Sequence, residues 1–419
     1  MKILHTSDWH LGKTLENINR ISEQKEFIDE LCGIAEKEEV DLVLIAGDIF
    51  DTYTPSTAAE ELFYDAVDRL NCKGKRAVVV IAGNHDSPDR LCAASPLAYK
   101  NGIILLGYPG SDPGTYGVNG SNIKITRSGR GWMELEIAGC GHNAVIIVLP
   151  YPSEARLEQV LSSVADEALL QQAYSDRIGS MLQELSAEFR EDTVNLIVGH
   201  LYMRGGSQSD SERQLGGALM VDPAVLPDRA HYIALGHLHR PQKVGGAPAL
   251  AYYSGSPLAY SFSETDYSKL VLVVDIAPGS QPVEKKIFLN SGKPLRRWEA
   301  KNGIEEALKW CEEGRDANAW IDLEIHTQRV LTSEEQKKLR ELHPGIVNIR
   351  PVLKAEADEV VEYRSRESKR MDELFKDYYR HRMGAEIASE IMETFLDVIN
   401  SEDEENLAVG GGGFEAEVS

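Results

Sequence analysis

Two histidines separated by one residue follow an apolar run in the middle of the chain. The run "HYIAL" is followed by Gly236 and then by His237 and His239. Residues two apart on an extended chain project from the same side, so both imidazoles face one region beyond the end of a predicted strand. Imidazole is a common ligand of divalent transition metals, but a histidine pair between Gly and Pro also occurs in ordinary loops. The pair alone leaves both interpretations open.

The same pattern recurs at the ends of four other predicted strands, in "SDWH", "GDIFD", "GNHD" and "GH". The candidate metal-binding or catalytic residues in these motifs are Asp8, His10, Asp48, Asp51, Asn84, His85, Asp86 and His200. Taken singly, each motif is also typical of a strand-end turn or a cap. Five such motifs at the ends of successive strands in one α/β region favour a common site.

The side chains in these motifs define the chemistry of that site. They combine carboxylate and amide oxygens with imidazole nitrogens and include no thiolate. This mixture suits Mn²⁺, Fe²⁺ or Zn²⁺ better than Ca²⁺ and is typical of two-metal hydrolases. Gly47, Gly83, Gly199 and Gly236 each come directly before a candidate ligand, where glycine permits a sharp exit from the strand and close backbone approach.

The elements that position the motifs follow from the hydrophobic pattern. Residues 1–275 alternate predicted strands and helices, beginning with a short strand in "MKILHTSD" and a helix at 21–39. A Gly-rich stretch at 107–131 predicts hairpins or a loop. Continuous apolar runs, typical of strands buried on both faces, predict strands at 41–48, 76–86, 102–107, 144–150, 194–200, 231–237 and 268–276.

The composition changes at 277–282, where "APGSQP" predicts a domain boundary. Residues 295–353 then predict a small α+β unit in which helices and strands alternate. In "LTSEEQKKL" the spacing of Ser333 and Gln336 predicts a capping box at the start of a helix.

The C-terminal part has two further segments. Residues 367–399 predict one or two helices with an apolar stripe, interrupted at Gly384. The stripe either packs on the protein's own core or docks on a partner. The segment 401–419 is acidic and Gly-rich and is expected to be disordered.

The overall composition is ordinary for a soluble globular protein. The chain has 419 residues, of which 42% are hydrophobic and 26% are charged. No apolar stretch reaches the roughly 18–20 residues of a membrane span, and polar residues interrupt the N-terminal stretch where a signal peptide would be apolar. The five cysteines are scattered, which argues against a disulfide framework and favours a reducing, cytoplasmic setting.

The net charge of −23 initially argues against nucleic acid, whose binding proteins usually carry a basic face. The acidity is uneven, however, because residues 383–419 hold ten acidic and no basic residues. Bound divalent cations would also invert the field at the site itself. The net charge is therefore a poor guide to the substrate.

The five motifs, in this order, resemble the signature motifs of the calcineurin-like metallophosphoesterases over most of residues 1–275. The opening "MKILHTSDWHLGKTL", the segment "YSGSPLAYSF" and the C-terminal arrangement narrow the resemblance to the nuclease-subunit family of the bacterial SbcCD complexes. The resemblance implies an α/β fold of four layers, with two packed β-sheets flanked by helices, a small α+β capping domain and C-terminal partner-binding helices. The implied domains are a nuclease domain at 1–276, a DNA-capping domain at 280–360, helices that dock on an ATPase at 365–400, and the tail at 401–419.

The resemblance also implies two metal ions, with Mn²⁺ expected, and a set of ligands for them. The ligands of the first metal are Asp8, His10 and His239, those of the second are Asn84, His200 and His237, and Asp48 bridges the two.

Three further residues of the motifs are not metal ligands in this assignment. The resemblance implies that His85 donates a proton or contacts the transition state beside the scissile phosphate, and that Asp86 orients the His85 ring. Archaeal and eukaryotic members carry a histidine where this chain has Asp51, so Asp51 receives no role.

The function implied is that of a DNA exonuclease and endonuclease in repair, recombination and replication. The implied partners are DNA, an SbcC-type ATPase in a heterotetramer of two nuclease and two ATPase chains, and a second copy of this chain, in a cytoplasmic, nucleoid-associated setting. Basic residues at 296–297, 337–340 and 363–370 either contact phosphates or form solvated faces.

Two rival interpretations use the same residues. A phosphodiesterase or phosphatase for small molecules or phosphoproteins would have the same site, but it needs neither the capping unit nor the C-terminal helices. A metal-free scaffold that keeps only the fold is disfavoured because all seven candidate ligands are present.

Overall fold

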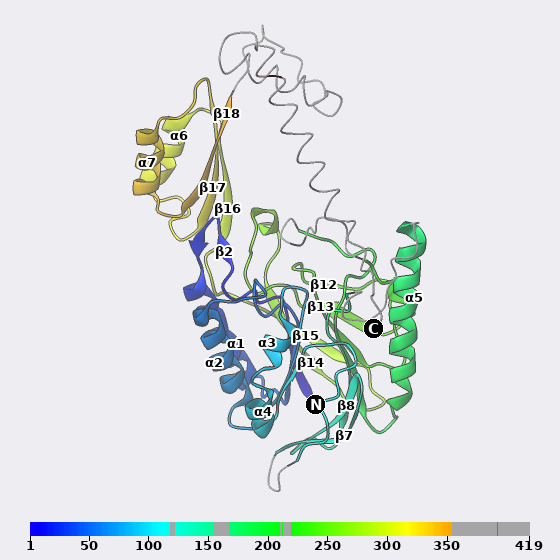
Figure 1. The fold of residues 1–419 in the computed structure, drawn as a ribbon. Coiled ribbons are helices and arrows are strands. Elements are labelled where there is room, and N and C mark those ends of the chain that lie inside the picture. The colour runs from blue at the N-terminus through cyan, green and yellow to red at the C-terminus, as the bar shows by residue number, and fades with distance from the viewer. Residues whose placement is uncertain (118–121, 154–166, 210–211, 213–218, 354–391, 393–419) are drawn as a thin grey trace, which may run out of the picture. The chain divides into compact units, whose positions relative to one another are not determined.

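The computed structural model describes residues 1–117, 122–153, 167–209, 212, 219–353 and 392 (Figure 1). The predicted helices at 367–399, apart from Met392, and the acidic segment at 401–419 lie outside the described residues. Among the helices in these ranges, none has both the length and the apolar character needed to span a bilayer.

The first sheet has six strands in the order β15-β14-β1-β4-β5-β6. Its strands are β1 (Lys2–Thr6), β4 (Leu42–Ala46), β5 (Ala77–Ile81), β6 (Ile103–Leu106), β14 (Leu270–Asp275) and β15 (Val283–Phe288). β1, β4, β5 and β6 are parallel, β14 pairs with β1 in antiparallel orientation, and β15 pairs antiparallel with β14 at the edge of the sheet. β15 lies beyond the domain boundary predicted at 277–282 and was not predicted as a strand. Its sequence "VEKKIF" is exposed and charged, and so resembles a linker more than a buried strand.

The second sheet has seven strands in the order β12-β13-β11-β10-β9-β8-β7. Its strands are β7 (Ile123–Gly129), β8 (Trp132–Ile137), β9 (Ala144–Leu149), β10 (Val194–His200), β11 (Tyr232–Gly236), β12 (Gln242–Lys243) and β13 (Leu250–Tyr253). β9, β10, β11 and β13 are parallel. The central strands are buried along their whole length, as their continuous apolar runs predict.

The two sheets pack face to face, and helices cover their outer faces. Residues from both sheets, including Leu44 and Leu196, form one buried apolar cluster. On the far side of the first sheet lie α1 (Ile21–Lys37) and α2 (Thr57–Asn71), whose apolar residues pack against β4 and β5. On the far side of the second sheet lies α5 (Glu167–Leu185). The predicted four-layer α/β fold is confirmed.

Shorter elements connect these layers. They are β2 (Thr14–Leu15), β3 (Ile18–Asn19), α3 (Pro88–Cys92) and α4 (Ser95–Ala98).

A smaller sheet with its own apolar core follows the linker after β15. It consists of β16 (Leu295–Ala300), β17 (Trp320–Thr327) and β18 (Ile346–Leu353), with α6 (Ile304–Glu312) and α7 (Ser333–Leu342) packed on it. The capping box of α7 was predicted one residue too late. Thr332 is the N-cap and Glu335 its partner, because Thr332 holds the extended backbone that a cap requires and its side chain accepts from the Glu335 amide.

The smaller sheet is tied to the first large sheet through α1. Glu23 Oε1 accepts a hydrogen bond from Trp320 Nε1 at 3.0 Å, and Glu23 Oε2 lies 2.8 Å from Arg20 Nη2. Arg20 and Glu23 are both buried. This buried ion pair, fully hydrogen-bonded, fixes the small unit beside the N-terminal end of α1.

Candidate metal centre

The five polar motifs lie at the carboxyl ends of parallel strands in both large sheets. In the first sheet, Asp8 follows β1, Asp48 follows β4 and Asn84 follows β5. In the second sheet, His200 ends β10 and His237 directly follows β11. Because the two sheets pack on each other, these strand ends meet and their side chains form one buried group.

Four of the candidate ligands hold a left-handed backbone that residues other than glycine rarely adopt. The φ angles are 53° at Asp8, 44° at His10, 50° at Asp48 and 110° at His237. Each such residue costs about 1–3 kcal/mol, and residues of this kind concentrate at functional sites. The surrounding buried structure maintains these turns, which direct the side chains towards one another.

Two of the predicted glycines permit close approach of the backbone. A Cβ at Gly83 would overlap the Asp48 side chain, and a Cβ at Gly236 would overlap the Ala46 carbonyl oxygen. Any larger residue at these positions would push the strand ends apart.

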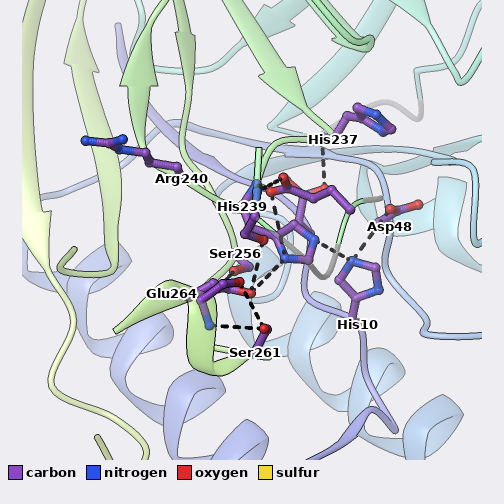
Figure 2. A network of polar contacts seen from close by, with 12 residues as sticks. His10, Asp48, His237, His239, Arg240, Ser256, Ser261 and Glu264 are labelled. Atoms are coloured by element: carbon purple, nitrogen blue, oxygen red, sulfur yellow. Dashed lines mark hydrogen bonds and ion pairs between the residues drawn. The ribbon is translucent and has the colours of Figure 1, made fainter. Parts of the chain in front are cut away.

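The first ligand group consists of Asp8, His10 and His239. His10 Nε2 and His239 Nε2 lie 3.0 Å apart, and Figure 2 shows these two nitrogens directed towards each other. Asp48 Oδ2 lies 3.6 Å from His10 Nε2. Two imidazole nitrogens and two carboxylates thus converge on one point.

The second ligand group is centred on Asn84. Its Oδ1 lies 2.9 Å from His200 Nε2 and 3.0 Å from His237 Nδ1. Asp48 Oδ2 lies 3.5 Å from His200 Nε2, so one carboxylate oxygen is about equally distant from the two groups. The structure therefore brings all seven predicted ligands together and places Asp48 between the two sets.

The electrostatics of these residues suit a divalent cation. Burial lowers the pKa of His10 to about 4 and the pKa of His237 to about 3, which leaves both imidazoles neutral and able to donate a lone pair at neutral pH. Burial alone would raise the pKa of Asp48, but the adjacent His200 holds it well below its usual value. Burial opposes charge on His200 too, yet Asp48 raises its pKa to about 9, so a cation that binds here displaces a proton.

Two buried ring nitrogens of candidate ligands, His10 Nδ1 and His237 Nε2, make no hydrogen bond to the described part of the chain. Buried polar atoms without partners are rare in folded proteins and mark strained or functional positions. In both residues it is the other ring nitrogen that faces the ligand groups. The convergent donors fit a metal site better than a set of internal hydrogen bonds.

His85 lies beside the first ligand group. Its ring centroid is 4.8 Å from that of His10, and its backbone amide donates to Asp48 Oδ1 at 2.9 Å. His85 Nδ1 lies 2.8 Å from the backbone carbonyl oxygen of Asp51, so this carbonyl sets the orientation of the ring.

Asp86 is directed at the backbone. Its carboxylate accepts hydrogen bonds from the amides of Gly83, Ile49 and Phe50 at 2.7, 3.1 and 2.9 Å. These contacts clamp the loop after β4 to the loop after β5 and so hold Asp48 and Asn84 in register.

Sequence reasoning missed several residues around His239. Glu212 accepts from the His239 amide, and Glu264 Oε1 lies 3.4 Å from His239 Nδ1. Lys269 Nζ donates to Glu264 Oε2 at 2.5 Å. Glu264 lies two residues after the segment "YSGSPLAYSF", which supported the resemblance, but no spacing rule connects it with a histidine 25 residues earlier.

Comparison with known families agrees with the fold and the site. A sequence profile of the family described as Calcineurin-like phosphoesterase matches residues 1–241, more than half of the chain. A second profile, described as Type 5 capsule protein repressor C-terminal domain, matches residues 291–383. The chain is thus a member of the calcineurin-like phosphoesterases.

Relatives narrow this class further. The SbcD subunit of the SbcCD nuclease from Bacillus subtilis (strain 168) is 45% identical over 409 residues, which cover 97% of this chain and 100% of the relative. A protein of the same name from Staphylococcus epidermidis is 30% identical over 84% of this chain and 86% of its own length. Another, from Rhodobacter capsulatus, is 33% identical over 67% of this chain and 68% of its own length. The chain belongs to the family of SbcD subunits of SbcCD nucleases. The predicted family and enzyme class are confirmed, and the phosphoesterase domain implies divalent metal ions.

Proposed function

We propose that the chain is a two-metal DNA nuclease that works with an SbcC-type ATPase as a double-strand exonuclease and a single-strand or hairpin endonuclease. The observation that carries the proposal is the position of Asp48. One oxygen of its buried carboxylate lies 3.6 Å from an imidazole nitrogen of the first ligand group and 3.5 Å from one of the second. A carboxylate shared between two sets of donors is the arrangement that two adjacent dications require.

Each ligand group would hold one ion, and we propose Mn²⁺. Asp8, His10 and His239 hold the first, Asn84, His200 and His237 hold the second, and Asp48 is shared. The ions would supply Lewis acidity, a lowered pKa for a water nucleophile and compensation for the charge that develops on the phosphoryl oxygens.

We assign proton transfer to His85. Its Nδ1 faces the Asp51 carbonyl, which favours the tautomer with the proton on Nδ1 and leaves Nε2 as the nitrogen that meets substrate. The backbone amide of His85 is fixed by Asp48, so the ring has a set place relative to both ligand groups. From this place His85 either contacts a phosphoryl oxygen or, once protonated, donates to the leaving oxygen.

DNA would approach along the small sheet. A cavity of about 520 Å³ is lined by residues of β2, by Tyr260 and by Arg297, Asp322 and Arg350 of the small sheet. The Tyr260 ring centroid is 5.6 Å from that of His10, so this cavity lies next to the first ligand group. We propose that the small sheet and its helices, which form the part of residues 280–360 that follows β15, cap the nuclease domain. β15 itself is a strand of the first large sheet and extends the nuclease domain beyond the predicted range 1–276. The two arginines would contact phosphates.

The partner assignment rests on the relatives, which are named as subunits of SbcCD. We propose that residues 365–400 dock on the ATPase, in an assembly of two copies of each chain. A chain ending at Glu367 is expected to fold, bind metal and hydrolyse a simple phosphodiester but not to co-purify with the ATPase. Aggregation or loss of metal in this shortened chain would place the segment in the protein's own core.

The test of function uses labelled hairpin DNA, linear duplex DNA and a small chromogenic phosphodiester, each with Mn²⁺, with and without the ATPase and ATP. We expect DNA cleavage that the ATPase extends to duplex ends. Hydrolysis of the small diester without cleavage of any DNA, even with the ATPase, would contradict the proposal and favour a small-molecule phosphodiesterase.

A further inference from the structure

The two histidines of the first ligand group each face a carboxylate on the side away from the group. His10 turns Nε2 towards His239 and Asp48, and its Nδ1 lies 3.5 Å from Asp51 Oδ1. The same Asp51 oxygen accepts a hydrogen bond from Lys13 Nζ at 2.7 Å.

The arrangement at His239 repeats this pattern with different residues. His239 turns Nε2 towards His10, and its Nδ1 lies 3.4 Å from Glu264 Oε1 (Figure 2). The other oxygen of Glu264 is 2.5 Å from Lys269 Nζ, and Lys269 also donates to Ser256 Oγ at 2.7 Å. Glu264 is 1% exposed and Lys269 is 9% exposed, so this ion pair is largely shielded from water.

The histidines of the second ligand group lack this arrangement. His200 Nδ1 lies 2.9 Å from the backbone carbonyl of Ala46, which is a neutral partner. His237 Nε2, the nitrogen turned away from Asn84, has no hydrogen-bond partner within the described ranges. His10 Nδ1 makes no hydrogen bond there either, but it differs in facing the Asp51 carboxylate at 3.5 Å. The two groups therefore differ in whether a carboxylate lies beside the imidazole nitrogen that points away from the group.

We propose that Asp51 and Glu264 are positioning residues that make the first ligand group the higher-affinity metal position of the two. A carboxylate beside Nδ1 favours the tautomer with the proton on that nitrogen, aims the Nε2 lone pair and makes the imidazole a stronger donor. Lys13 and Lys269 hold the carboxylates in place. The inference rests on the proposed two-metal function and assigns Asp51 a role although it is not itself a ligand.

The test is a titration of the metal-free full-length protein with Mn²⁺. Binding is monitored by calorimetry and by the electron paramagnetic resonance signal of free Mn²⁺. The wild type is expected to bind in two steps of unequal affinity. Asp51→Asn and the double variant Glu264→Gln/Lys269→Met should weaken the tighter step by about 10–100-fold and leave the weaker step unchanged. The double variant avoids a buried lysine without its ion-pair partner.

Glu134→Gln is the matched control. Glu134 lies on β8, away from the ligand groups. Its buried carboxylate forms an ion pair with Arg190, with 2.8 Å between Glu134 Oε1 and Arg190 Nη2. This variant should bind Mn²⁺ as the wild type does, even if its melting temperature falls.

Two outcomes overturn the inference: unchanged affinities in both test variants, or equal weakening of the two steps. Since Asp51 is partly exposed, Asp51→Asn carries the test if the double variant fails to fold. Failure of the proposed function looks different, because the wild type itself would then bind fewer than two ions.

Discussion

Two clusters of histidine and carboxylate side chains in the described part of the chain are similar in composition and opposite in setting. The first is the buried centre, which includes Asp8, His10 and His239. The second, here called the β-surface cluster, consists of Glu299, Glu324 and His326 on β16 and β17. In both clusters the potential ligand atoms lie within 4.8 Å of one another.

The β-surface cluster is explained by ordinary surface pairing. Glu299 and Glu324 occupy paired positions on adjacent strands, and His326 Nε2 lies 3.2 and 3.5 Å from their oxygens. Lys301 Nζ lies 3.3 Å from Glu299, and all of these side chains have contact with solvent. A cation here would compete with water and with a lysine for the carboxylates, so its affinity would be low.

The buried centre offers no such alternatives. Its imidazoles point at each other, burial keeps at least two of them neutral, and its carboxylates are shielded from water. Burial and the direction of the lone pairs, more than residue type, therefore distinguish a metal site from a surface ion pair.

The largest expected effect comes from Asp48→Ala. Because the carboxylate faces both ligand groups, its removal should abolish hydrolysis of DNA and of a small phosphodiester. A discontinuous nuclease assay with Mn²⁺ measures this. Retention of substantial activity would mean that the buried centre does not depend on a shared ligand.

His85→Ala should have the next largest effect and should separate catalysis from metal binding. Cleavage should slow by roughly 10²–10⁴-fold if the residue transfers a proton, while DNA binding persists. Single-turnover cleavage and Mn²⁺ calorimetry on the same preparation provide the two readouts. Loss of metal in this variant would instead make His85 a ligand.

Mn²⁺ should stabilise the fold through the buried centre alone. Binding to the folded state at a concentration 100 times the dissociation constant contributes about 2.7 kcal/mol per site to the free energy of unfolding. Thermal unfolding with and without Mn²⁺ should show this stabilisation in the wild type and little of it in Asp48→Ala. Equal stabilisation in both would place the relevant ions elsewhere.

The smallest effect is expected from the double variant Glu299→Gln/His326→Ala in the β-surface cluster. Glu299 is exposed and His326 is partly exposed, so the free energy of unfolding should change by no more than about 0.5 kcal/mol per substitution. Hydrolysis of a small phosphodiester should match the wild type. A large loss of that activity would show that the cluster contributes to the site after all.

The sequence predicts the central strands and the motifs at their ends because both depend on local patterns, whereas the four layers follow from the family resemblance. Continuous apolar runs ending in Gly and a polar residue define β4, β5, β10 and β11, and the motifs at their ends lie where the structure brings them together. Shifts of one residue, such as the cap at Thr332, arise because the adjacent Thr332 and Ser333 are both of a type that caps helices.

Contacts between distant segments could not be predicted. The pairing of Glu264 with His239 depends on how the loop after β13 folds back on the loop after β11. The carbonyl of Asp51 beside His85 is a backbone group, which no residue pattern reveals. β15 was missed because its faces are exposed and carry charge.

The most direct test of the central claim is the metal content of three proteins after dialysis against excess Mn²⁺ and removal of free ions, measured by mass spectrometry. We expect about two ions per chain in the wild type and in Glu299→Gln/His326→Ala, and neither ion retained in Asp48→Ala. One ion held with full affinity in Asp48→Ala, or an ion lost from the β-surface variant, would contradict a buried centre built around a shared carboxylate.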